Sequence, residues 1–206
     1  MALNEIGLPH LFALAAALGW ASGMRLYATV LIVGLGGRLG WLPLPAGLEV
    51  LTHGGVLIAA GVLAAVEFLA DKIPAVDSLW DMVHTVIRIP AGAALAAGAL
   101  SAQGVGGEAW TVIAALLGGT LAATAHAAKT GTRAAANTSP EPFSNIALSL
   151  SGDLLVPALL WLAWNHPLAS AVLLVLLLIV AVLLIRLTFR LLRGLASKLR
   201  GGARAA

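Results

Sequence analysis

The sequence contains no cysteine. This absence excludes disulfide bonds, thiolate nucleophiles and metal sites built from cysteine. Charge is also scarce, since only 10% of the residues are charged and 60% are hydrophobic, with a mean hydropathy of +0.98. Soluble domains carry about 25% charged residues. The composition therefore indicates an integral membrane protein.

The first nine residues contain no lysine or arginine and include Glu5. A secretory signal peptide begins with a basic segment. We therefore expect the first apolar stretch to remain in the protein as a transmembrane helix.

The last 21 residues contain no acidic residue. Half of the chain's cations lie there, at Arg186, Arg190, Arg193, Lys198, Arg200 and Arg204. A basic tail after a membrane helix indicates the cytoplasmic side, so the high pI does not imply nucleic-acid binding. Arg186, Arg190 and Arg193 share one helix face, which is also suited to contact with anionic lipid headgroups. An orientation signal alone explains the same pattern.

A spanning helix needs about 20 apolar residues, and this rule predicts an all-α polytopic protein of about six transmembrane helices. The expected helices cover approximately residues 9–36, 48–72, 78–102, 109–136, 143–164 and 168–199. We divide them into a first three-helix half (1–103), a second three-helix half (104–185) and a basic cytoplasmic tail (186–206). Breaks are predicted at Ser22-Gly23 and, because proline removes a helix hydrogen bond, at 89–92.

One motif occurs in both halves: Ser/Thr-Gly-x-Arg-x-x-Ala, at 22–28 and at 130–136. An arginine beside a glycine in a hydrophobic helix is costly, and two such motifs suggest two inverted three-helix repeats with broken helices. With six spans and the basic tail inside, the N-terminus is expected to be cytoplasmic too. These features predict a multi-pass protein of an inner (plasma) membrane.

Polar residues recur at helical spacing along the second to the fifth of the expected helices. In the region of the second and third helices they are Glu67, Asp71, Lys72, Asp77, Asp81, His84 and Arg88. On the fourth and fifth helices they are His126, Lys129, Arg133, Asn137, Asn145, Ser149 and Asp153. Steps of three and four residues give three helix faces, and Glu67 and Asp71 are likewise four residues apart. The faces are Asp77, Asp81, His84 and Arg88; His126, Lys129, Arg133 and Asn137; and Asn145, Ser149 and Asp153. Ionisable residues inside a membrane usually face the bundle interior and pair with one another.

These residues also have simpler explanations. Asp71, Lys72 and Asp77 could be interfacial loop charges, and Lys129 and Arg133 could be cytoplasmic anchors. Arg25, Asp81, His84 and Arg88 could form structural ion pairs that fix helix packing.

Several kinds of chemistry are not supported by the sequence. Asp77, Asp81 and His84 have metal-compatible spacing, but Arg88 and Lys72 would oppose a bound dication, so no metal and no other cofactor is expected. The glycine-rich segment 34–40 matches neither a phosphate-binding loop nor a dinucleotide fingerprint. An enzyme acting on lipid, with His84 or His126 as base, lacks a nucleophile, and we expect the protein not to be an enzyme.

Four motifs resemble a bacterial family of small integral membrane proteins known as domain of unknown function 4126. They are Ser22-Gly23-Met24-Arg25; Glu67 to Pro74 with Asp77; Arg88 before Pro90-Ala91-Gly92-Ala93; and His126-Ala127-Ala128-Lys129 with Arg133 and Asn137. The resemblance covers about residues 12 to 160. It implies no established activity.

The polar positions predict a small transporter or channel that moves an ion or polar solute, with proton coupling available through histidine. The pathway residues would be Arg25, Glu67, Asp71, Asp81, His84, Arg88, His126, Lys129, Arg133, Asn137 and Asp153. The alternative is a non-transporting membrane scaffold or lipid-interacting protein. The expected partners are the lipid bilayer and the solute, without nucleic acid, and a homodimer is compatible with so few helices.

Overall fold

The computed structural model describes residues 7–101, 107–137 and 143–202. The side chains of residues 74–75 and 195–202 are outside this description, which includes those of Lys198 and Arg200. Glu5, most of the glycine-rich loop after residue 101 and Arg204 also lie outside the described residues.

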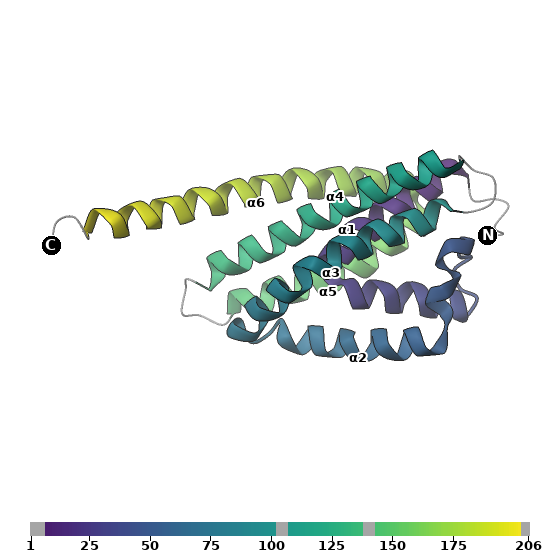
Figure 1. Cartoon of the computed structure of the whole chain (residues 1–206), viewed down its shortest axis with the longest axis horizontal. Helices are drawn as coiled ribbons and strands as arrows, with labels where there is room; N and C mark the ends of the chain where they lie inside the picture. The colour runs from purple at the N-terminus through teal and green to yellow at the C-terminus, as the bar shows by residue number, and fades with distance from the viewer. Residues whose placement is uncertain (1–6, 102–106, 138–142, 203–206) are drawn as a thin grey trace.

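The described residues form a bundle of α-helices with one short 3₁₀ helix (Figure 1). The elements are α1 (Leu8–Arg38), η2 (Ala46–Thr52), α2 (Gly54–Ala70), α3 (Pro74–Leu100), α4 (Gly107–Ala136), α5 (Phe143–Asn165) and α6 (Pro167–Gly202). Five helices are long and apolar enough to cross a membrane, or six if η2 and α2, bent by 70°, form one broken span. The predicted all-α polytopic fold is confirmed.

Helix α1 is broken at Arg25, whose φ of −147° and ψ of 78° are not helical. The chain turns back there, and we call the two arms together the α1 hairpin (Figure 1). In the first arm, Phe12 packs edge-on against Trp110 near the start of α4, with ring centroids 5.3 Å apart. In the second arm, Gly34 lies against Leu51 and Leu57, where η2 ends and α2 begins. Both arms therefore open at the same end of the bundle.

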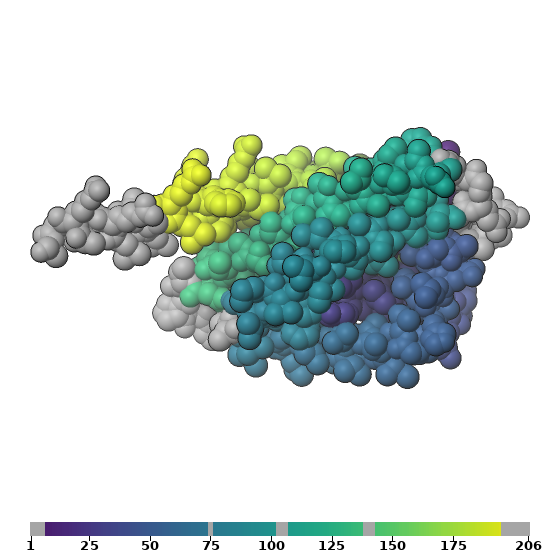
Figure 2. Space-filling model, viewed as in Figure 1, coloured from purple at the N-terminus to yellow at the C-terminus, as the bar shows by residue number. Residues whose placement is uncertain are grey.

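The predicted interruption at Ser22-Gly23 is thus present two residues later, but its consequence differs from the expectation. A helix that crosses the membrane would have its ends on opposite sides, whereas the two ends of α1 lie at the same end of the bundle. In Figure 2, atoms of α1 are visible between α2 and α3, where the second arm lies behind the gap.

Other segments also differ from the sequence prediction. Helix α3 continues through Pro90 rather than breaking at 89–92, because in an otherwise regular membrane helix one missing N–H is tolerated. Residues 46–52 form the separate η2, so the second helix begins at Gly54 rather than near residue 48. Helix α4 is continuous through the second copy of the repeated motif, at Gly131 and Arg133. The two copies therefore have different backbones, and an inverted repeat is not confirmed.

Small residues allow α1, α3 and α4 to pack closely. A Cβ on Gly19 would lie 2.7 Å from the Cα of Gly118, and one on Gly92 would lie 2.6 Å from the Cβ of Ala122. Membrane helices associate by such close packing because lipid gives no hydrophobic driving force between them. These contacts pack the first arm of the α1 hairpin, and also α3, closely against α4.

Long apolar side chains on the outer faces of α2, α3 and α6 are exposed, as expected for surfaces that face lipid. Helix α6 packs along α4 as far as Thr188, which lies beside Gly131, and then projects beyond the other helices (Figures 1 and 2). At the end where α6 projects, α2 leads into α3 and α4 ends (Figure 1).

Candidate functional site

Ten charged residues from α1 to α5 form one connected set of ion pairs, which we call the charge cluster. Its cations are Arg25, Lys72, Arg88, Lys129 and Arg133, and its carboxylates are Glu67, Asp71, Asp77, Asp81 and Asp153. Among the charged residues that the structure describes between 7 and 165, only Arg38, Glu49 and Glu108 lie outside it. Equal numbers of both signs make the cluster neutral when every member is ionised.

Asp71 is the centre of the charge cluster. It caps the C-terminus of α2 and is fully buried. Its carboxylate pairs with Arg25, with Lys129 Nζ at 3.3 Å and with Arg133 Nη1 at 3.1 Å. A carboxylate that leaves water needs such partners, because burial of an unpaired charge is prohibitively costly. Asp71 thus ties the α1 hairpin and α4 to the end of α2.

Arg25 lies at the apex of the α1 hairpin and is 3% exposed. Besides Asp71, its guanidinium pairs with Asp153 at 2.9 Å and donates hydrogen bonds to the carbonyl and hydroxyl oxygens of Ser149, both at 3.0 Å. Ser149 and Asp153 are one helical turn apart on α5, as the predicted stripe requires. The break in α1 is therefore fixed by ionic contacts to α2 and α5.

Arg88 is fully buried and lies about 14 residues into α3, roughly 20 Å along its axis. It pairs with Glu67 of α2 at 2.5 Å. It also pairs at 2.9 Å with Asp81, which lies two helical turns earlier on the same face of α3. Its Nη1 also lies 3.2 Å from Nδ1 of His126 on α4. The deepest cation of the charge cluster thus joins three helices.

Helix α4 contributes the other two buried cations. Lys129 pairs with Asp81 at 3.2 Å and donates to the carbonyl of Met24 at 3.3 Å, next to the break in α1. Arg133 pairs with Asp77 at 3.0 Å. Both side chains are buried rather than directed to solvent, so they are more than cytoplasmic anchors.

Lys72 and Asp153 form the exposed edge of the charge cluster. Their side chains are 28% and 23% exposed, and 3.9 Å separates the ammonium from the carboxylate. Lys72 lies between α2 and α3 and also contacts the ring of Phe68. Burial lowers the pKa of Lys72, and the carboxylate of Asp153 opposes this shift.

Two histidines adjoin the charge cluster with defined hydrogen bonds. The Nδ1 of His84 lies 2.7 Å from the carbonyl of Trp80, so this nitrogen donates and Nε2 accepts from the hydroxyl of Tyr27 at 2.9 Å. In His126, Nδ1 faces the donor Arg88, so Nε2 donates to Thr85 at 2.8 Å. These contacts fit neutral imidazoles, which can each accept a proton.

The structure brings together nearly all the predicted pathway residues. Asn137 lies at the edge, 2.6 Å from Asn145 and 3.3 Å from Ser78. Arg186, Arg190 and Arg193 are on α6, which contributes nothing to the charge cluster in the described part of the chain.

The sequence argument missed Tyr27 and Thr85. Tyr27 is the chain's single tyrosine and follows Arg25 by two residues, a signal that could have been used.

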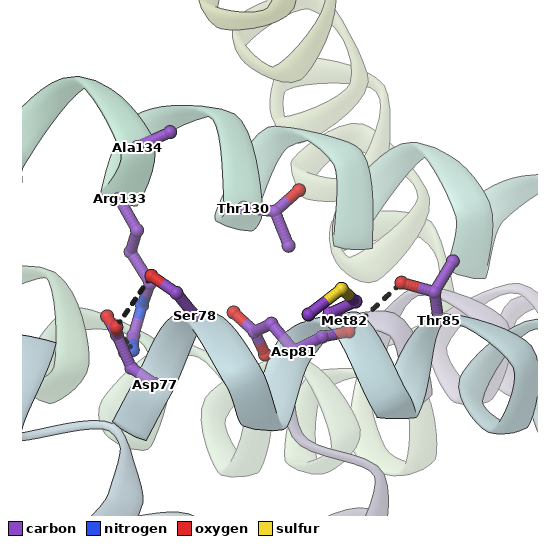
Figure 3. Close-up of a pocket in the computed structure, with 8 residues that line it drawn as sticks. All are labelled: Asp77, Ser78, Asp81, Met82, Thr85, Thr130, Arg133 and Ala134. Atoms are coloured by element: carbon purple, nitrogen blue, oxygen red, sulfur yellow. Dashed lines mark hydrogen bonds and ion pairs between the residues drawn. The ribbon is translucent and has the colours of Figure 1, made fainter. Parts of the chain in front are cut away.

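A pocket of about 260 Å³ lies between α3 and α4 next to the charge cluster (Figure 3). We call it the α3–α4 pocket. Its lining residues are Asp77, Ser78, Asp81, Met82, Thr85, Thr130, Arg133 and Ala134. Within the described residues, no group of three or more histidine, aspartate or glutamate side chains is arranged to hold a metal ion.

The fold and this buried ionic centre define a polytopic α-helical membrane protein. The chain belongs to the family described as a domain of unknown function, DUF4126, whose model matches residues 12–187. Comparison with curated proteins and with solved structures finds no match.

Proposed function

We propose that the protein is a small membrane transporter or channel that moves an ion or small polar solute through the charge cluster. The observation that carries this proposal is Arg25, a buried charge at the apex of a re-entrant hairpin. Non-helical backbone at membrane depth is tolerated where it is buried in protein or lines a polar cavity, and broken helices are typical of transport sites. A chain that needed only stable packing would have no requirement for such a break.

Proton coupling is part of the proposal. His84 and His126 adjoin the charge cluster, and each has one ring nitrogen that accepts a hydrogen bond and is a site for a proton. Protonation of His126 would place a second positive charge beside Arg88 and weaken the pairs of Arg88 with Glu67 and Asp81. A proton and a solute could thereby compete for the same carboxylates.

The distribution of cations supports an orientation in which the charge cluster opens toward the cytoplasm. Lys72, Arg133 and the exposed arginines of α6 lie toward the end of the bundle where α6 projects, and lysine and arginine favour the cytoplasmic side. The start of α1 lies at the other end. The predicted cytoplasmic location of the C-terminus is kept in this proposal, whereas the N-terminus is assigned to the opposite side, because α1 turns back instead of crossing.

The alternative of a scaffold or lipid-interacting protein is favoured by a different observation. Every cation of the charge cluster is already paired with at least one carboxylate. Such a set of pairs could serve only to hold α1 to α5 in register. This reading predicts no flux and a loss of stability when one partner is removed.

The two functions are separated by flux measurements on purified protein in liposomes, using a pH-sensitive dye and charge movement with a panel of cations, anions and small acids. The test variant is Arg25→Ala, and its matched control is Arg38→Ala, an exposed arginine in the same helix and outside the charge cluster. Flux that Arg38→Ala keeps and Arg25→Ala loses, with both variants folded, supports transport. No flux from the inserted wild-type protein with any solute supports the scaffold.

A further inference from the structure

The α3–α4 pocket opens toward the lipid, unlike the rest of the charge cluster. Met82 in its lining is 66% exposed, and the neighbouring Leu79 and Val83 are 59% and 53% exposed. Long apolar side chains at this exposure mark the lipid-facing side of α3. The pocket is therefore a lateral opening between α3 and α4, and Figure 3 shows the lining residues that these two helices contribute.

The depth of the pocket matches the headgroup region. Asp77 and Asp81 lie three and seven residues into α3, roughly 5 and 10 Å from its beginning. The polar headgroup layer of a bilayer lies at the edge of the hydrocarbon core and extends outward from it over a similar distance. A polar group that enters here from the side belongs to the interface rather than to the bilayer centre.

The lining presents one guanidinium with an unused donor. Arg133 is 3% exposed, and its Nη1 makes all of its pairs with Asp71 and Asp77. Its Nη2 is buried and has no acceptor among the described residues. A buried donor without a partner is destabilising, so an oxygen supplied by a ligand would be stabilising.

The lining also presents an unused acceptor of the opposite sign. Arg88 and Lys129 both pair with Oδ1 of Asp81, and Oδ2 has no ion pair or hydrogen bond among the described residues. A simple anion in the pocket would be repelled by Asp77 and Asp81, and a simple cation would be repelled by Arg133 and by Lys129 behind it. A ligand that carries both charges satisfies both groups.

We propose that the α3–α4 pocket binds the zwitterionic headgroup of a phospholipid with a primary ammonium and a phosphate. A phosphate oxygen accepts from Nη2 of Arg133, and the ammonium donates to Oδ2 of Asp81 and to the hydroxyl groups of Thr85 and Thr130. The acyl chains lie along Met82 and the apolar face of α3. This site goes beyond the proposed function and is measured as binding, so it stands or falls independently of any flux.

The test is native mass spectrometry of the delipidated full-length protein titrated with phosphatidylethanolamine, phosphatidylcholine or phosphatidylglycerol of the same acyl chains. Phosphatidylcholine lacks N–H donors and phosphatidylglycerol lacks the cation. We expect phosphatidylethanolamine to bind about tenfold more tightly than either, the ratio for one charge-assisted hydrogen bond. Soluble O-phosphoethanolamine is added in competition. If it displaces the lipid at equal concentration, the ligand of the α3–α4 pocket is a soluble zwitterion and the lipid proposal is overturned.

Two variants fill the pocket without removing an ion pair: Met82→Trp from α3 and Ala134→Phe from α4. The matched control is Val83→Trp, which adds a tryptophan at the next, equally lipid-facing position outside the lining. Loss of the phosphatidylethanolamine preference in both pocket variants, with retention in the control, supports the site. Equal binding of the three lipids by the wild type, or an unchanged preference in the filled variants, overturns it.

Discussion

At the scale of single residues, the pairing in the charge cluster is uneven. Asp71 balances three buried cations, whereas Asp153 is partly exposed and pairs with Arg25 and the edge residue Lys72. Removing one partner of a buried pair leaves an uncompensated charge, which costs about 3–5 kcal/mol, while partly exposed pairs contribute about 1 kcal/mol or less. Position in the set of pairs, rather than residue type, should therefore decide the effect of a substitution.

Asp71→Asn is expected to lower the free energy of unfolding by about 3–5 kcal/mol, because Arg25, Lys129 and Arg133 lose their shared carboxylate. Asp153→Asn, the matched control, should cost about 1 kcal/mol. Thermal unfolding in detergent, followed by tryptophan fluorescence, measures both. Equal losses in the two variants would contradict the central role of Asp71.

The pair Glu67–Arg88 allows the coupling energy between two buried charges to be measured. Arg88→Met is expected to destabilise the fold strongly because Glu67 is then buried with a charge and no cation. The double variant Arg88→Met/Glu67→Gln should recover about 1–3 kcal/mol of that loss, the usual range for coupled neighbours. Chemical denaturation of the two single variants and the double variant gives the coupling energy. Additive losses would show that the pair is not energetically coupled.

At the scale of helices, periodicity was a good guide to which faces meet. Asp77, Asp81 and Arg88 share one face of α3, and Lys129 and Arg133 share one face of α4, so pairing across the two helices follows from spacing alone. The reversal at Arg25 does not follow from spacing. The length of an apolar segment does not show whether the chain continues straight or turns back within it. The turn depends on the contacts of Arg25 with Asp71 and Ser149, which lie far away in the sequence.

The continuity of α3 through Pro90 was missed for a related reason, whereas α4 agrees with the single helix expected at 109–136. Pro90 and Gly131 are locally unfavourable in a helix, but neighbouring helices outweigh these local costs. The identical motif breaks α1 and not α4. Local sequence therefore permits a break without determining where one forms.

Close helix packing gives a prediction at this scale. Gly19→Ala is expected to destabilise the bundle by about 1–3 kcal/mol, since its Cβ would lie 2.7 Å from the backbone of Gly118. Gly61→Ala on α2 is the control, because its Cβ would meet only Leu31 Cδ1 at 3.8 Å. The control should be neutral or stabilising by up to about 1 kcal/mol through helix propensity. Unfolding temperatures of the two variants test this, and a tolerated Gly19→Ala would refute the packing argument.

At the scale of the whole molecule, a re-entrant α1 hairpin would change the number of membrane crossings from even to odd. An even number of crossings returns a chain to its starting side, whereas the proposed topology, a re-entrant α1 hairpin followed by crossings of α2 to α6, does not. The start of α1 and the projecting end of α6 accordingly lie at opposite ends of the bundle (Figure 1). The hairpin also leaves the charge cluster covered by packed helices on the side where α1 enters, and closer to the surface at the α2–α3 connection.

The absence of native cysteine allows this topology to be tested with single-cysteine reporters. Leu8→Cys and Trp41→Cys flank the α1 hairpin, at positions 51% and 76% exposed, and Phe143→Cys at the start of α5 is 74% exposed. We expect a membrane-impermeant maleimide added to intact cells to label Leu8→Cys and Trp41→Cys alike, while Phe143→Cys reacts only after lysis. If α1 crossed the membrane, Leu8→Cys would instead behave like Phe143→Cys. That result would restore an even number of crossings and place Arg25 in the middle of a spanning helix, where the re-entrant argument for transport no longer applies.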